Sequence, residues 1–503
     1  MRTILCRSTL ACSLLTASVA QASPLFDLGG DMGSTAGQQA RVLPEGSGAA
    51  YFNPSLLVEA PEGLTFGVVV LTQQIGLTLD GRPGTQFAVP TGLENAGHAD
   101  NTRWDNYPIA TTLLQNGRMK DALHAPLTPR PRQGASTGHQ THTYEMIGLV
   151  TKFFDKRLAF GIHGLVPNGD FTQMNAFYND EREQYFSNSL HPELYGDRLT
   201  ALSIAFGAGL KLSDDFALGV GATMSLKAIV GAPTYVADTG NLGNILVDIK
   251  GSVKVALSPH FGASYKLTPR WRLTATAHAP EKLELSTNFT FLLANGLEQA
   301  SGITFVHDYT PWQLGAGSAY DLIQEREQTL SLVGTLLYAK WSDYRDRHGN
   351  APTPSYAWGD TLSPSFGVHH RWGQTKSFLD LVYQPTPVPE QTGRTNYVDN
   401  DRAGVDGGIE YQFTVWGTPM RVGAQAQVHV LIPRRQTKLP TPTYADGKNR
   451  TPELVKDEVP DDSQISGTPV KGVNGLQTNN PGWPGFGSGG AIITAGLYFS
   501  VTP

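Results

Sequence analysis

The stretch FALGVGATMSLK, residues 216–227, alternates between two kinds of side chain without a break. One set is mostly large and apolar, and the other is small or polar. Because successive side chains of a β-strand point to opposite faces, this pattern predicts a strand with one apolar face and one polar face. The same alternation returns in the segments 202–211, 271–278, 312–321, 405–415 and 421–430. The sequence therefore predicts an all-β protein built from many two-faced strands.

Short and long connectors alternate between these strands. The short ones lie near residues 155–157, 213–215, 268–270, 324–328, 371–376 and 417–419, and the long ones cover about 80–140, 169–197, 231–246, 290–310, 345–358, 388–402 and 433–488. Together they join about fourteen strands, and an even number with short turns at one end is typical of bacterial membrane barrels. We therefore expect a transmembrane antiparallel β-barrel.

Two further observations favour a membrane barrel over a soluble β-sandwich, whose strands also alternate. The faces predicted to point outward carry almost no charge, and the opposite faces have few large residues that could fill a dry core. Four tryptophans are expected to adjoin short turns and to form an aromatic girdle at the membrane interface. They are Trp271, Trp312, Trp372 and Trp416.

The first 22 residues have the features of a secretory signal peptide. Basic residues precede an apolar run from residue 10 to residue 20, and Ala20-Gln21-Ala22 is a small-x-small cleavage site. The only two cysteines, Cys6 and Cys12, would be removed with this segment, so the mature chain would contain no thiol. We expect a multi-pass protein of the outer membrane of a Gram-negative bacterium, without disulfides or Cys-ligated metals.

Composition argues against several other functions. The chain has 503 residues, 55 glycines and a net charge of −6, which becomes −8 when Arg2 and Arg7 leave with the signal peptide, so nucleic-acid binding is not expected. There is no Gly-x-Ser-x-Gly motif, and the histidines at 139, 142, 369 and 370 lack partners at recognisable spacing. We therefore expect no enzymatic activity, no cofactor and no metal site.

The segment AAYFNPSLL, residues 49–57, resembles the Asn-Pro signature of the FadL-type outer-membrane transporters for long-chain fatty acids and other hydrophobic compounds. Ser55 stands where that family usually has Ala. A second match is YQPTPVPE at 383–390, followed by DNDR at 399–402, which resembles a late strand, a Pro-rich loop and an Asn-Asp-Arg element of the same family. The resemblance covers essentially the whole mature chain.

This resemblance implies a plug, called the hatch, inside the barrel. Residues 23–62 would form the hatch, with its signature at Tyr51, Phe52, Asn53 and Pro54, and residues 63–503 would form the barrel. The residue chemistry is compatible, because a proline biases the preceding residue away from helix and an Asn side chain can cap a local turn. The residues alone favour an ordinary turn into the first strand, and the resemblance reverses that preference.

The resemblance also implies a sideways opening in the third strand, which is kinked in that family. Here the third strand reads FGIHGLVPNG, residues 160–169, and the residues that would weaken the wall are Gly161, Gly164, Pro167 and Gly169. Proline cannot donate to the strand ladder, and glycine often marks a bulge. The residues alone favour the alternative that Pro167 simply ends the strand at the loop.

Candidate ligand contacts fall into two groups. Apolar residues of the two first long loops could capture a hydrophobic ligand or pack on one another; they are Leu113, Leu114, Met119, Leu123, Met174, Phe177, Tyr178 and Phe186. Three cations face inward by alternation and could hold a carboxylate, or they could pair with lumen acids such as Asp406 and Glu410. These cations are Lys227, Arg272 and Arg421.

We expect the chain to take up fatty acids or other hydrophobic compounds, acting as a monomer in outer-membrane lipid. The final strand TAGLYFSV, residues 494–501, has the form of a signal for the outer-membrane insertion machinery, with Thr502-Pro503 after it. Alternatives are an aromatic hydrocarbon channel, a general porin, an outer-membrane enzyme and an adhesin. The hatch-like segment argues against a porin, and the long loop before the last strand keeps an adhesin open.

Overall fold

The structure is a computed structural model, and part of the chain is described in it. The described residues are 24–31, 37–79, 134–169, 199, 201–228, 234–237, 244–251, 253–292, 298–345, 351–352, 357–392, 397–437, 464–465, 468–469 and 485–502. The predicted signal peptide and most of the two first long loops lie outside these residues.

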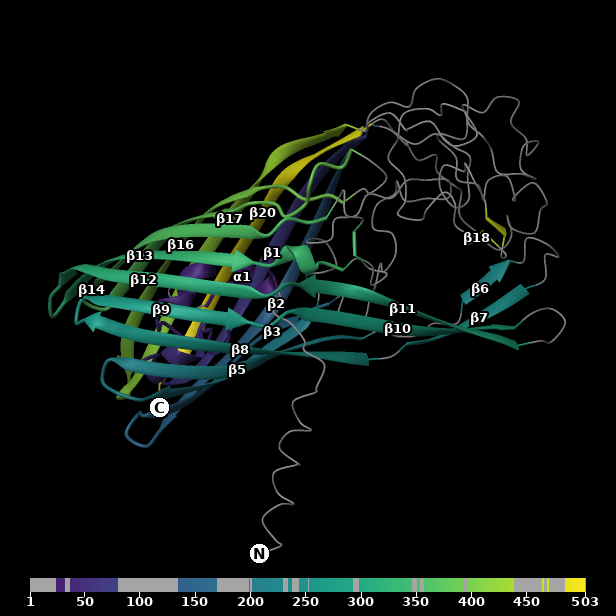
Figure 1. Cartoon of the computed structure of the whole chain (residues 1–503). Coiled ribbons are helices and arrows are strands. Elements are labelled where there is room, and N and C mark those ends of the chain that lie inside the picture. Colours follow the sequence, from purple (N-terminus) through teal and green to yellow (C-terminus); the bar gives the residue numbers. More distant parts are fainter. Residues whose placement is uncertain are drawn as a thin grey trace, which may run out of the picture.

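Fourteen antiparallel strands form a closed ring, which confirms the predicted barrel and its strand number (Figure 1). In ring order the strands are β1 (Gly63–Leu79), β2 (Gly134–Phe153), β3 (Leu158–Pro167), β4 (Leu202–Lys211), β5 (Phe216–Ala228), β8 (Val253–Thr268), β9 (Trp271–His278), β12 (Gln313–Gln324), β13 (Gln328–Ala339), β14 (Thr361–Trp372), β15 (Thr375–Gln384), β16 (Arg402–Val415), β17 (Thr418–Thr437) and β20 (Gly485–Val501). The last strand closes the ring, because β20 pairs with both β1 and β17.

Two of the predicted long connectors contain strands. A four-stranded sheet extends beyond the barrel at the loop end, and it contains β6 (Thr234–Ala237), β7 (Asn244–Gly251), β10 (Glu281–Leu292) and β11 (Glu298–Thr310) (Figure 1). The segments 231–246 and 290–310 do connect strands of the barrel, as predicted, and parts of them are themselves strands of this second sheet. These connectors are rich in Thr, Val, Ile and Phe, and pairing with one another gives their backbone groups hydrogen-bond partners outside the ring.

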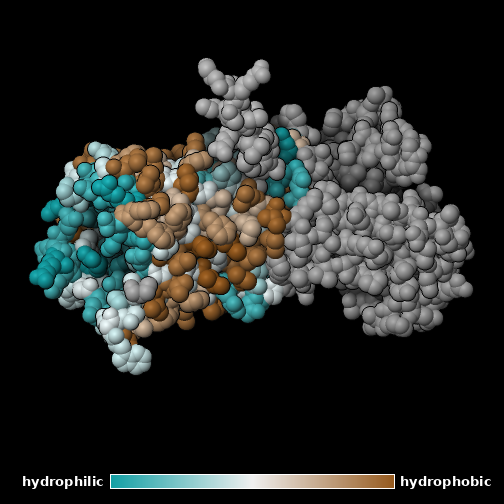
Figure 2. Space-filling model, turned by 90° about the horizontal axis from the view of Figure 1, so that it is seen from below, coloured by the Kyte–Doolittle hydropathy of each residue, from teal (hydrophilic) through white to brown (hydrophobic). Residues whose placement is uncertain are grey.

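The distribution of polarity is the reverse of that in a soluble protein. Outward side chains are apolar and exposed, such as Val220 at 55 % and Leu497 at 67 %, whereas the inward Thr223 and Thr494 are fully buried. Figure 2 shows the outward residues as a hydrophobic band, bordered by hydrophilic residues at the turn end of the barrel. This arrangement suits a barrel that has lipid outside and polar groups inside. No helix in the described part of the chain is long and apolar enough to cross a membrane.

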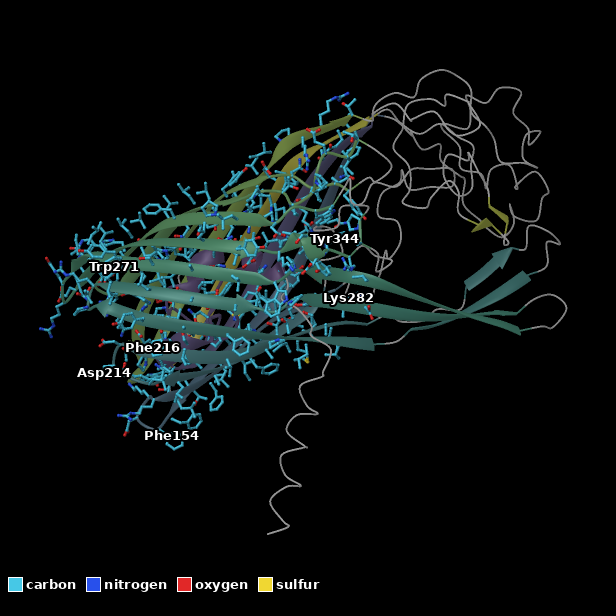
Figure 3. The ribbon with its side chains drawn as sticks, in the orientation of Figure 1. Phe154, Asp214, Phe216, Trp271, Lys282 and Tyr344 are labelled. Atoms are coloured by element: carbon cyan, nitrogen blue, oxygen red, sulfur yellow. The ribbon has the colours of Figure 1, made fainter. Side chains whose placement is uncertain are left out.

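The six short turns lie where the sequence predicted them, at one end of the barrel. Trp271 lies at that end (Figure 3), and so do Trp372 and Trp416. Trp312 does not, and its prediction was wrong: it precedes β12, whose short turn follows the opposite end of the strand. The pairing agrees, because Tyr320 of β12 lies opposite Trp271, while Gln313 lies opposite His278.

The N-terminal residues 24–31 and 37–60, which we call the lumen segment, lie within the ring of strands (Figure 1). The segment comprises α1 (Pro24–Gly29), η1 (Gly37–Arg41), α2 (Ala49–Phe52) and η2 (Pro54–Val58). Elements α2 and η2 contact β3, β4 and β5, while η1 contacts β13 and β14 on another side of the ring. The lumen segment therefore bridges walls that are far apart around the barrel.

We predict that a charged residue on the outward face of the barrel destabilises the protein far more than a charged residue that lines the lumen at the turn end. Val220→Arg should lower the free energy of unfolding in lipid vesicles by about 2 kcal/mol or more, because a lipid-facing charge must be buried in hydrocarbon. Thr329→Arg, at a position that lines a solvent-filled hollow at the turn end, is the matched control. Equal stability of the two variants in urea titrations would contradict a lipid-facing wall.

Candidate functional site

The Asn-Pro signature forms a compact turn in the lumen. Asn53 is extended, with φ −162° and ψ 94°, as expected for a residue before proline, and Pro54 begins η2. The Asn53 side chain caps this helix, since its Oδ1 accepts hydrogen bonds from the Ser55 amide at 3.2 Å and from the Ser55 hydroxyl at 2.6 Å. Its Nδ2 donates to the Arg41 carbonyl at 2.9 Å. Ser55 therefore adds a second bond to the cap that an alanine could not make.

The aromatic residues before this turn are buried. Tyr51 and Phe52 are fully covered, and the ring of Phe26 lies 4.5 Å from that of Tyr51. The guanidinium of Arg41 lies 5.2 Å above the Phe52 ring and makes a 3.0 Å ion pair with Asp27. Burial raises the pKa of the Tyr51 hydroxyl well above its usual range, so this ring stays uncharged.

The turn rests on a patch of glycines in the inner wall, which we call the glycine wall. It consists of Gly161 on β3, Gly207 on β4, Gly219 on β5 and Gly262 on β8. A Cβ on Gly219 would lie 2.2 Å from the Ser55 amide nitrogen, and one on Gly262 would lie 2.0 Å from Asn53 Oδ1. Only glycine permits such close approach of the two backbones. At Gly207, Gly219 and Gly262 a larger residue would therefore overlap the lumen segment, whereas a Cβ on Gly161 would meet the flexible end of the Leu57 side chain.

The four residues that were predicted to weaken β3 lie in different parts of that strand and its end. Strand β3 pairs with β2 through Pro167 and with β4 through Leu165, and neither pairing contains a register shift. Gly161 belongs to the glycine wall, where its Cβ would meet Leu57. Gly164 lies in the paired part of the strand. Only the end of β3, from residue 166 onward, lacks a β4 partner, and Gly169 follows it with φ +123°.

Two of the three predicted cations are engaged in ion pairs. Arg272 on β9 donates to Glu59 of the lumen segment at 2.5 Å, and Lys266 on β8 lies 3.0 Å from the same carboxylate. Arg421 on β17 pairs with Glu410 at 3.2 Å, the partner that the sequence offered as one alternative. The side chain of the third cation, Lys227, lies outside what the structure describes, as do the predicted loop contacts of residues 113–123 and 174–186.

Arg421 also links the wall to the lumen segment. Its Nη1 donates to the Glu45 carbonyl at 3.2 Å, and its Nη2 donates to the Ser500 hydroxyl at 3.0 Å. The Glu45 carboxylate forms an ion pair with Lys376 on β15. The lumen segment is thus held to the wall by two acids, Glu45 on one side and Glu59 on the other.

These acids lie over a hollow of about 510 Å³ at the turn end of the barrel, which we call the vestibule. Its walls include Arg272, Lys376 and Arg371, and its upper surface includes Glu45 and Glu59 of the lumen segment. A hollow lined by so many charged groups is a poor environment for an alkyl chain or an aromatic ring. The vestibule is therefore a polar compartment.

On the opposite side of the lumen segment, apolar residues form a continuous cluster, although the buried carboxyl groups of Glu281 and Asp308 also lie near Tyr51. A single buried cluster extends from Phe26 and Tyr51 to a group of aromatic residues near the loop end of the barrel. Within that group the rings of Tyr344 and Trp358 stack with centroids 3.6 Å apart; Figure 3 shows Tyr344 at the end opposite Trp271. The other aromatic members are Tyr309, Trp341 and Tyr397. We call this continuous cluster the apolar column.

Sequence reasoning did not identify several of these residues. The aromatic group was not predicted. Trp358 and Trp341 lie in or beside the long connector at 345–358, and large aromatic residues in a connector could have indicated a buried cluster there. Histidine 369 does have a partner, because its Nε2 lies 2.8 Å from Asp380 on the neighbouring strand. Within the described residues no three His, Cys, Asp or Glu side chains gather so as to hold a metal ion.

We predict that adding a single methyl group to the glycine wall unseats the signature turn. Gly262→Ala should open a conducting path in planar bilayers, because the new Cβ would overlap Asn53 Oδ1. Gly334→Ala is the matched control, since its Cβ would meet nothing closer than the Ser365 carbonyl at 3.8 Å. A Gly262→Ala protein as tightly closed as the control would contradict the assignment of the glycine wall.

Comparison with known proteins identifies the fold. No protein-family model matches the chain, and no curated protein matches it. Among solved structures it is similar to a FadL homologue of Pseudomonas aeruginosa, with a TM-score of 0.50 and 15 % identity over 96 % of this chain and 98 % of the other. It is also similar to the P. putida toluene transporter TodX, with a TM-score of 0.49 and 12 % identity over 95 % and 99 % of the two chains. The chain therefore has the fold of the FadL-type transporters.

Proposed function

We propose that the protein lies in the outer membrane and takes up hydrophobic compounds through its plugged barrel. The observation that carries this proposal is the order of polarity along the lumen: the apolar column, then the lumen segment, then the charged vestibule. The fold that it shares with a FadL homologue supports the same reading. So does the Asn-Pro signature, which forms the contact between the plug and the wall.

The apolar column would attract a solute without any chemical reaction. Transfer of an alkyl chain from water to an apolar site is favourable by roughly 0.8 kcal/mol for each CH₂ group. A hydrophobic compound that reaches the loop end would therefore move along residues such as Trp358, Tyr344 and Tyr51 as far as the lumen segment. An aqueous pore gives no such advantage to an apolar solute, which favours selective uptake over general diffusion.

The charged vestibule makes a straight exit unfavourable. A hydrophobic compound that passed the lumen segment would enter a compartment with Glu45, Glu59, Arg272 and Lys376 on its surface. A sideways exit into the bilayer avoids this cost. The exit that we propose lies between Val166 and Gly169, where β3 is no longer paired with β4. This part of β3 is the C-terminal part of the opening that the sequence predicted.

Residues 23–62 would act as the hatch of this transporter. Two kinds of contact support a closed position of this hatch: Asn53 and Pro54 lie against the glycine wall, and Glu45 and Glu59 are paired with wall cations. A shift of the hatch would have to break those contacts. We propose that Arg272 and Arg421 serve this closure rather than the binding of a ligand carboxylate, since both already have acidic partners.

The uptake experiment separates this proposal from a general porin. Cells of a host that lacks its own hydrophobic-compound transporters should accumulate radiolabelled oleate or naphthalene when they express the chain. They should not become permeable to a hydrophilic solute of similar mass, such as sucrose, because the hatch closes the lumen to water. Large steady conductance and sucrose uptake, without accumulation of either hydrophobic compound, would show that the barrel is a porin.

A second experiment tests the role of the lumen cations. Arg421→Ala should change oleate uptake and naphthalene uptake by the same factor, because the arginine acts through the hatch and not through a ligand carboxylate. Val422→Ala, at the neighbouring outward position, is the control for a general effect on β17. A loss confined to oleate would instead assign Arg421 to the binding of the carboxylate.

A further inference from the structure

The pairing of the barrel wall is interrupted at three places in the described residues. Two of the register shifts, between Lys266 and Thr268 and between Asp321 and Ile323, lie next to short turns. The third lies far from any short turn, where β17 meets β20 between Leu431 and Arg434. A bulge in the body of a wall is a local weakness, because the ladder is broken and one residue is left without a cross-strand partner.

The third interruption removes hydrogen bonds from the seam between the two strands. Leu431 lies opposite Gly490 and Arg434 opposite Ser488, so that Ile432 and Pro433 have no regular partner on β20. Pro433 has no amide hydrogen to donate. The Ile432 amide donates to the Asp401 carbonyl at 2.8 Å, on the side of the strand that pairs with β16. The β17–β20 ladder is therefore interrupted for these two residues of β17, and it resumes at Arg434 opposite Ser488.

A groove of about 600 Å³ lies on the wall at the same place. Three of the β20 residues that line it, Gly487, Gly489 and Gly490, have no side chain to fill it. On β17 the outward residues Val430 and Ile432, 48 % and 40 % exposed, lead up to the groove. Polar residues also line the groove, namely Gln74, Thr78, Arg434 and Arg435. The groove therefore lies at the upper edge of the hydrophobic band, where the apolar outer face of the wall meets polar residues.

On the inner side the interruption is closed by one side chain. Asn400, only 1 % exposed, donates through Nδ2 to the Ile432 carbonyl on β17 at 2.9 Å and to the Ser488 carbonyl on β20 at 3.2 Å. Its Oδ1 is buried and has no hydrogen-bond partner among the described residues. One amide group thus bridges both strands, and the bridge is itself incompletely satisfied.

Apolar residues lie in the lumen beside this bridge. Val398, Leu77 and Phe486 form a buried cluster in which each member is at most 7 % exposed. Phe486 lies on β20, two residues before Ser488, and Val398 lies two residues before Asn400. An apolar chain that passed the seam would therefore meet apolar side chains on both sides of it.

We infer that the seam between β17 and β20 is a side inlet, through which an uncharged alkyl chain or aryl ring passes from the outer leaflet into the lumen. Asn400 is its latch, because the inlet opens when the Asn400 amide releases Ile432 and Ser488. The inference rests on the proposed function, and it adds a route of access from the membrane at a site distinct from the proposed exit at β3. No covalent step is involved.

A reversible disulfide tests the inlet directly. A Cβ on Gly489 would lie 3.4 Å from the Pro433 Cα, so Pro433→Cys with Gly489→Cys brings two thiols within disulfide reach across the seam. The matched control is Ala426→Cys with Ala495→Cys, a directly opposed outward pair lower on the same two strands. Naphthalene uptake would be measured in cells for each pair, oxidised and then reduced, beside the unsubstituted chain.

Oxidation of the upper pair should lower uptake about fivefold or more, because closing a gate blocks the route that it controls. Reduction should restore it, and the lower pair should respond to neither treatment. Equal uptake by the oxidised and reduced upper pair would overturn the inlet, and so would an equal loss with the lower pair. Absence of naphthalene and oleate uptake by the unsubstituted chain would contradict the proposed function itself. That outcome differs from failure of the inlet alone, in which the unsubstituted chain still takes up these compounds.

Substitution of Asn400 gives a second, independent test of the inlet. Asn400→Ala removes both bridging hydrogen bonds, so naphthalene uptake should rise while sucrose stays excluded by the hatch. Heat-modifiable migration on gels checks that the variant barrel is folded. Uptake unchanged from the unsubstituted chain, in a folded Asn400→Ala protein, would contradict the role of Asn400 as the latch.

Discussion

Between residues 49 and 58 the backbone of the lumen segment lies directly on the inner wall of the barrel, and the rest of the structure depends on this contact. It depends on glycine at Gly207, Gly219 and Gly262 on three neighbouring strands, because a Cβ there would overlap the backbone of the segment or the Asn53 side chain. It also requires the turn to be rigid, which Asn53 achieves by capping η2 and by bonding to the Arg41 carbonyl. The lumen segment is thus held against the wall by non-covalent contacts alone, and the closure that we propose depends on them.

Three environments meet at this plug. Lipid-facing side chains surround the barrel, the apolar column lies on the loop side of the lumen segment, and the charged vestibule lies on the turn side. An apolar solute is favoured in the first two environments and disfavoured in the third. The direction of transport that we propose follows from this order. An apolar solute can enter the lumen from the loop side or from the membrane, but its transfer into the charged vestibule is unfavourable.

Much of the fold could be predicted from the sequence, because strand alternation and turn residues are local signals. The strand number, the six short turns and the extended conformation of Asn53 are of this kind. The glycine wall could not be predicted, since 55 glycines are present and only the strand register shows which of them face the turn. The ion pair of Glu59 with Arg272 joins residues 213 apart in the chain, and the seam at β17 and β20 depends on pairing that no local pattern reveals.

Hydrogen–deuterium exchange in lipid vesicles tests the central claim most directly. If the lumen segment is seated on the glycine wall, backbone amides such as those of Tyr51 and Leu56 should exchange as slowly as those in the middle of β5. Their exchange should become faster when a transported compound is added and the hatch shifts. Rapid exchange of these amides before any compound is added, with β5 fully protected, would show that the barrel is not closed by this segment.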